Sequence, residues 1–188
     1  MFKSLWKVPS HVATPYDQHQ FFWRYFDAEP GSASPFIFHM LRDRTRAIVL
    51  SSVRPRENEY MENLSEYIFT PQVGRNYHFA ARVNPSKRLA STGKRVSITG
   101  EDEIIDWFAG KLEGSGSGRI HKIWISAPLE KKSFFKAGRK TQMPVTIGSV
   151  EVEGLLECRD SEKLKKIVEQ GIGSGKSFGF GMLILMNS

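Results

Sequence analysis

Alternating hydrophobic and polar positions in the first half of the chain predict four strands. The strands cover residues 2–8, 35–43, 46–55 and 76–83, and a tight polar turn at residues 43–45 joins the second to the third. A helix is expected between the first two strands. This order is the first part of a ferredoxin-like βαββαβ unit whose second helix is missing or degraded.

The helix is expected over residues 14–27, where the apolar spacing changes to that of a helix. Thr14 is suited to cap its start, Pro15 to the first helical position, and Asp17 to complete a capping box. Its predicted core face consists of Phe22, Trp23 and Phe26.

The second half of the chain repeats a similar mixture of strands and helices. Helices are predicted at 101–113 and 161–170, and strands at 119–129, 145–158 and 178–186. The two halves are therefore expected to form two small α/β sandwiches side by side.

Residues 171–185, "GIGSGKSFGFGMLIL", raise the question of a nucleotide site, because "GSGKS" is how phosphate-binding loops end. The spacing is unsuitable, since the first required glycine is replaced by Gln170. The order is also reversed, with a helix before the loop and a strand after it. Two interpretations remain: a helix-capping glycine followed by a kinked strand, or open backbone amides that an RNA backbone approaches.

Composition narrows the class of protein. The chain has 188 residues, a net charge of +7 and a pI near 9.6, which favour a polyanionic partner. Its one cysteine, Cys158, excludes a disulfide framework and a cysteine-based zinc cluster, which fits a reducing cytoplasm. No apolar run has the length of a membrane span, and the first residues lack the apolar core of a signal peptide.

Two windows, residues 82–95 and 131–140, gather basic residues without any acid. Turn residues place both windows on loops or hairpin tips, where they could reach a groove. A solvated face is the simpler interpretation of one charge run, but two such windows favour nucleic acid, and RNA in particular. The basic residues are Arg82, Lys87, Arg88, Lys94 and Arg95 in the first window, and Lys131, Lys132, Lys136, Arg139 and Lys140 in the second.

Tyr16 and His19 are the candidates for chemistry, because a spacing of three places them on one helix face. An imidazole can transfer protons at neutral pH, and a phenol can orient it or bind a phosphate. Arg24 could neutralise a phosphorane, although it lies off that face. On spacing alone, packing remains the simpler role for this pair. No metal-binding motif is present, so a nuclease here would use the RNA's own 2′-hydroxyl without a metal ion.

Three blocks carry a resemblance to a known family: "YDQHQFFWRYF" (16–26), "RVNPSKRLASTGKRVSI" (82–98) and the glycine-rich block (171–185). They resemble, in the same order, those of the CasE family of CRISPR-associated endoribonucleases. These enzymes belong to Cascade-type (type I-E) systems and to the RAMP superfamily.

The resemblance implies an α+β protein of two tandem ferredoxin-like domains, the first possibly degenerate, over residues 1–92 and 93–188. It implies cleavage of precursor CRISPR RNA at the 3′ base of the repeat stem-loop, giving a 2′,3′-cyclic phosphate (or 3′-phosphate) and a 5′-hydroxyl. His19 would be the catalytic histidine, Tyr16 its partner, and Arg24 a basic residue near the scissile phosphate.

The resemblance also implies a retained RNA product and other Cascade-type subunits as partners, with no cofactor. Gly173, Gly175 and Lys176 would then approach RNA, together with the two basic windows. A non-cleaving RNA-binding subunit on the same fold is the alternative. A basic protein on anionic membranes ranks lower, because no basic amphipathic helix is present.

Overall fold

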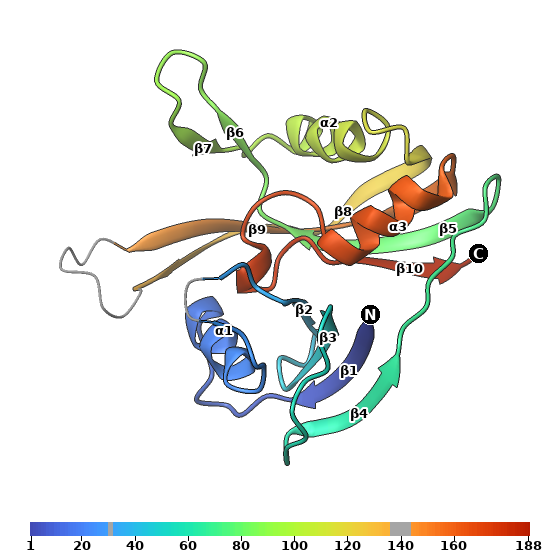
Figure 1. Ribbon diagram of the computed structural model, residues 1–188. Coiled ribbons are helices and arrows are strands. Elements are labelled where there is room, and N and C mark those ends of the chain that lie inside the picture. Colours follow the sequence, from blue (N-terminus) through green and yellow to red (C-terminus); the bar gives the residue numbers. More distant parts are fainter. Residues whose placement is uncertain (30–31, 136–143) are drawn as a thin grey trace. The chain divides into compact units, whose positions relative to one another are not determined.

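The structure is a computed structural model that describes residues 1–29, 32–135 and 144–188 (Figure 1). It separates into two compact units, and each combines segments that are distant in the sequence. The first unit comprises Met1–Ile68, Ser133–Val145 and Lys176–Gly179, and the second comprises Phe69–Lys132, Thr146–Gly175 and Phe180–Ser188.

The first unit is a four-stranded antiparallel sheet with the strand order β2-β3-β1-β4. This is the ferredoxin-like order, and the connection from β3 to β4 contains no helix, as the sequence predicted. The elements are β1 (Phe2–Lys7), α1 (Pro15–Trp23), β2 (Phe36–Met40), β3 (Arg46–Ser51) and β4 (Met61–Glu66).

The structure corrects the prediction for the last strand of this sheet. It is Met61–Glu66, whereas the sequence pattern predicts residues 76–83 there. An edge strand buries little, and none of the residues of β4 is fully buried, so its hydrophobic pattern is weak. The strand at 76–83 does form, but it pairs with β9 (Val145–Cys158) and β10 (Leu183–Asn187) of the other sheet.

The second unit is also ferredoxin-like, with the strand order β10-β5-β9-β8 and both helices on one face (Figure 1). A short hairpin of β6 and β7 is inserted between β5 and α2. The elements are β5 (Asn76–Val83), β6 (Ser86–Arg88), β7 (Arg95–Ser97), α2 (Glu101–Leu112), β8 (Gly118–Phe134), β9 (Val145–Cys158), α3 (Ser161–Gln170) and β10 (Leu183–Asn187).

The predicted division into residues 1–92 and 93–188 differs from this arrangement. The chain first passes from one unit to the other between Ile68 and Phe69. The reason is β5, which is the first strand of the second ferredoxin-like sheet. Alternation of buried and exposed residues predicts a strand well, but it does not say which sheet the strand joins.

The core of the first unit lies between α1 and the inner face of its sheet. Phe22 from the helix contacts Trp6 of β1 and Phe38 of β2, with ring centroids 5.5 and 4.8 Å apart, and all three are fully buried. The predicted face of α1 is confirmed for Phe22, whereas Trp23 is only partly buried. Rings that interdigitate in this way hold the helix firmly on the sheet.

Candidate active site

Helix α1 presents the two residues singled out for chemistry, and its start is anchored as predicted. The Thr14 hydroxyl accepts a hydrogen bond from the Asp17 amide (3.1 Å), and the Asp17 carboxylate accepts one from the Thr14 amide (3.1 Å). Tyr16 and His19 follow on this first stretch of helix, and both are partly exposed. Their spacing places the two Cβ atoms about 5–6 Å apart on one face.

Three aromatic rings surround the His19 imidazole. Trp23 lies one turn along the same helix at 5.3 Å between ring centroids, Phe36 of β2 at 5.7 Å, and Phe178 at 5.9 Å. The Nδ1 atom of His19 is buried. If His19 acts on a substrate, Nε2 is therefore the ring nitrogen that would do so.

Phe178 belongs to a short 3₁₀ turn, η1 (Lys176–Phe178), in the glycine-rich segment. The turn packs against α1 and β2 within the first unit. The Phe178 ring also contacts Phe134 near the end of β8, at 5.2 Å between centroids. Sequence reasoning missed Phe36 and Phe178 as neighbours of His19, because nothing in a single sequence indicates such long-range contacts.

The glycine-rich segment begins as the capping interpretation predicted. Gly171 ends α3 with a φ of 73°, and its amide donates to the Ile167 carbonyl. Gly173 packs closely, since a Cβ there would lie 2.9 Å from the Trp107 ring. These contacts explain the glycines without a nucleotide.

Two amides of the same segment remain open. Within the described residues, the N–H groups of Gly173 and Gly175 donate to no protein acceptor. Both residues have positive φ, and amides in loops of this kind can bind an anion. This arrangement is compatible with the predicted approach of RNA.

Lys176 is the first residue of η1 and is half-buried. Burial lowers the pKa of its ammonium group, because removal from water disfavours the charged form. As part of η1, Lys176 lies in the same unit as His19.

Arg24 caps the end of α1 and is exposed. It follows His19 by five positions, which on a helix points it away from the face that carries the imidazole. Its carbonyl accepts a hydrogen bond from the Arg56 guanidinium. The structure therefore does not group Arg24 with Tyr16 and His19 on one face.

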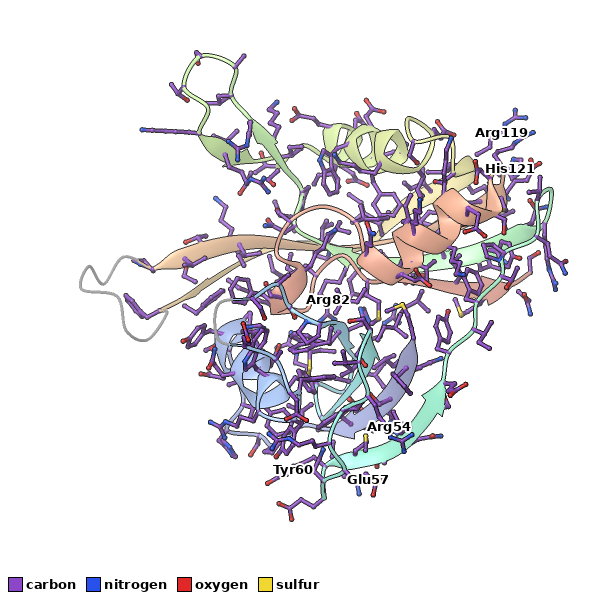
Figure 2. All side chains as sticks on the ribbon, in the orientation of Figure 1. Arg54, Glu57, Tyr60, Arg82, Arg119 and His121 are labelled. Carbon is purple, nitrogen blue, oxygen red and sulfur yellow. The ribbon has the colours of Figure 1, made fainter. Side chains whose placement is uncertain are left out.

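The first basic window forms a hairpin from Ser86 onward, as predicted, whereas Arg82 lies within β5, and two cations of the window have acidic partners. Arg82, labelled on β5 in Figure 2, pairs with Glu151 at 2.6 Å, and their side chains are only 13% and 20% exposed. Lys87 pairs with Glu103 at the start of α2. The window contains no acidic residue of its own, but acids from distant parts of the chain pair with two of its cations.

The remaining cations of this window are on the exposed surface of the β6–β7 hairpin. Arg88 and Lys94 are exposed, and within the described chain no carboxylate forms an ion pair with either. Arg95 is also exposed and donates weakly to the Ser86 hydroxyl at 3.5 Å. These three residues are available to meet an anion.

The second basic window is described only at its start. Lys131 and Lys132 lie in β8, and the Lys132 ammonium is 3.9 Å from the Glu130 carboxylate. Lys136, Arg139 and Lys140 lie outside the described residues.

Other candidate chemistry is sparse in the described ranges. His121 contacts Glu157 at 3.4 Å, near the start of β8, where Figure 2 labels it beside Arg119. No three or more histidine, cysteine, aspartate or glutamate side chains among the residues in view gather as metal ligands. None of the helices in these ranges has the length and apolar character that crossing a membrane requires.

Comparison with known proteins gives the class first. The sequence profile of a family described as "CRISPR associated protein" matches residues 6–186, which is nearly the whole chain. The fold agrees, since a solved structure of CRISPR endoribonuclease Cse3 bound to a 19-nucleotide RNA superposes with a TM-score of 0.81 at 23% identity, covering 98% of this chain and 99% of that one.

Two curated relatives give the family. The Cascade subunit CasE of Escherichia coli K12 is 30% identical over 188 aligned positions, which cover 90% of each chain. The CRISPR-associated endoribonuclease Cse3 of Thermus thermophilus is 35% identical over 120 positions, 58% of this chain and 55% of the relative. The chain therefore belongs to the CasE family of CRISPR-associated endoribonucleases.

Proposed function

We propose that this protein cuts precursor CRISPR RNA at the 3′ base of the repeat stem-loop, without a metal ion, and retains the product. The observation that carries the proposal is His19, held among three rings on a capped helix with Nδ1 buried and Tyr16 on the same face. Family membership supports ribonuclease activity, and the position of His19 supports a chemistry based on proton transfer.

The proposed reaction is an internal transesterification. The ribose 2′-oxygen attacks the adjacent phosphorus while the bond from phosphorus to the 5′-oxygen breaks. The 2′-hydroxyl loses a proton and the departing 5′-oxygen gains one, so the products are a 2′,3′-cyclic phosphate and a 5′-hydroxyl. Nε2 of His19 takes part in this proton transfer, and the Tyr16 phenol orients the imidazole or binds the phosphate.

Charge on the phosphorane must also be stabilised. Lys176 is a half-buried cation of the unit that contains His19, and a charge removed from water acts more strongly on a nearby phosphate. Arg24 is retained as a weaker candidate, because its helix position directs it away from His19. The 3′-phosphate would arise if the cyclic phosphate is later opened by water.

RNA binding is assigned to the exposed cations and the open amides. Arg88, Lys94 and Arg95 on the β6–β7 hairpin would contact phosphates, and the amides of Gly173 and Gly175 could donate to one more. Retention of the cut hairpin would make the protein a subunit of a Cascade-type complex in the cytoplasm. The name of the E. coli relative supports this role, since that protein is a Cascade subunit.

The test is cleavage of a labelled cognate repeat hairpin in EDTA by wild type, His19→Ala and the control His78→Ala. His78 is exposed on β5 of the second unit, so its loss removes an imidazole without touching the site. We expect one cut by wild type and by the control, and a rate reduced by about 10²–10⁴ in His19→Ala. Binding of the cognate hairpin by all three proteins with no cut would instead identify an RNA-holding subunit.

A further inference from the structure

The glycine-rich segment reaches the catalytic helix through one side chain. Phe178 comes far later in the chain than α1, yet its ring lies edge-on to the His19 imidazole, with an interplanar angle of 68°. Trp23 and Phe36 contact the imidazole as well. Each ring removes some of the rotational freedom of the histidine side chain, since rings in contact resist changes of χ1 and χ2.

The position of Phe178 depends on the residue that follows it. Gly179 has a φ of 82°, and a Cβ there would lie 2.6 Å from the Phe38 ring. A residue with a side chain would therefore be strained in its backbone and would collide with β2. Gly179 lets η1 lie directly on Phe38, and this places the adjacent Phe178 on His19.

Phe178 is held from a second direction. Phe134, which is 3% exposed, contacts the Phe178 ring at 5.2 Å and 60°. A ring fixed both by its neighbouring glycine and by a buried phenylalanine is a firm surface for a third ring. Phe38 and Gly179 thus fix the position of Phe178, and Phe178 in turn contacts His19.

We infer that Phe178 is a positioning residue for His19: it holds the imidazole so that Nε2 faces the RNA, without contacting the reacting atoms itself. The glycine-rich segment thus has a purpose distinct from phosphate binding, which is to carry an aromatic ring to the catalytic histidine. This inference rests on the proposed function, since it requires that His19 transfers the proton.

The inference predicts that loss of the ring slows the chemical step and leaves RNA affinity intact. Phe178→Leu keeps an apolar side chain but removes the flat surface against the imidazole. We expect the single-turnover rate constant at saturating protein to fall about 10- to 100-fold, because small errors in the position of a catalytic group have large effects. The Kd for the hairpin should change less than about twofold, and Phe178→Tyr, which restores a ring, should recover most of the rate.

Phe21→Leu is the control for the loss of an aromatic ring from the same unit. Phe21 lies on α1, is 5% exposed and contacts Trp6, Phe22, Tyr25 and Tyr60 rather than His19. We expect it to lower stability but to leave the rate constant of the folded protein unchanged. At saturating protein an unfolded fraction lowers the concentration of active protein but not the rate constant, so folding and positioning are separable. If Phe178→Leu does not fold, Phe178→Met takes its place.

Each outcome decides the matter. A wild-type rate constant in Phe178→Leu would overturn the inference and leave Phe178 as ordinary core packing. Weaker binding with a normal rate at saturation would also overturn it, because Phe178 would then contact RNA. If wild type makes no cut, the proposed function itself fails; if wild type cuts and Phe178→Leu cuts equally fast, only the positioning role fails.

Discussion

At the scale of single residues, the absence of a side chain decides how strands and rings pack. Gly154 on β9 pairs with Phe79 on β5, and a Cβ at Gly154 would lie 2.1 Å from the Lys122 carbonyl oxygen and 2.6 Å from the Phe79 ring. Phe79 in turn stacks on Phe108 of α2, with centroids 5.4 Å apart. One missing methyl group thus allows helix and sheet to meet in the second unit.

Gly154→Ala should therefore destabilise the protein. We expect the free energy of unfolding to fall by about 1–3 kcal/mol, the cost typical of an overpacked core, because a backbone carbonyl cannot move aside easily. Urea unfolding followed by circular dichroism measures it. Gly110→Ala is the control, because a Cβ at this exposed glycine in α2 would meet nothing within 4 Å. Alanine favours a helix more than glycine does, so the free energy of unfolding should rise by about 0.5–1 kcal/mol.

The candidate site shows which of its features individual residues predict from the sequence alone. The spacing of Tyr16 and His19 singles them out, and Thr14 and Asp17 predict the capping box that anchors their helix. Phe178 stands in a conspicuous glycine-rich block, yet no feature of the sequence connects it to His19. A contact between residues so far apart depends on how the chain folds, and local patterns do not contain it.

At the scale of elements, helix ends are set by local chemistry and are the easiest features to predict. Asp160 caps α3, where its carboxylate accepts a hydrogen bond from the Lys163 amide at 3.0 Å. This bond lowers the pKa of Asp160 below its ordinary value of 3.8, because the amide hydrogen favours the charged carboxylate. The strand β4, by contrast, was not predicted, because an exposed edge strand has little hydrophobic pattern.

The cap makes stability depend on pH. A carboxylate whose pKa is lower when folded contributes its full stabilisation above its unfolded value near 3.8, and the contribution is lost as pH falls through the lower, folded pKa. We expect wild type to be more stable than Asp160→Asn at pH 7, with the difference shrinking below pH 3.8. Urea unfolding at pH 7 and in acid measures both. A difference that stays constant across this range would mean that the charge of the cap contributes nothing.

At the scale of the whole molecule, the net charge of +7 predicts a polyanionic partner, and the fold shows which charges remain available. Arg82 is nearly covered and paired with Glu151, whereas Lys94 is exposed near the tip of the β6–β7 hairpin. The sequence places both in one basic window. The ion pair arises only because β5 lies beside β9 in the sheet.

Substitution of the two cations should therefore have different results. We expect Lys94→Met to weaken binding of the hairpin RNA and to reduce the slope of log K against log salt by about 0.7–0.9 for each phosphate that is no longer neutralised. Arg82→Met should leave that slope unchanged and lower stability instead, because it removes the ion pair of the largely buried Glu151 carboxylate. RNA-binding titrations at several salt concentrations measure the slope for each variant, and urea unfolding measures its stability. A lower slope for Arg82→Met would show that the ion pair opens to admit RNA.

The distance along the chain between His19 and Phe178 also has a consequence during synthesis. The ribosome makes α1 early, and upstream segments generally begin to fold before later ones emerge. The imidazole would nevertheless lack one of its three supporting rings until η1 leaves the exit tunnel. A nascent chain in which α1 has folded before η1 emerges would therefore hold His19 less firmly, and we expect it to cut RNA more slowly than the fully folded protein does.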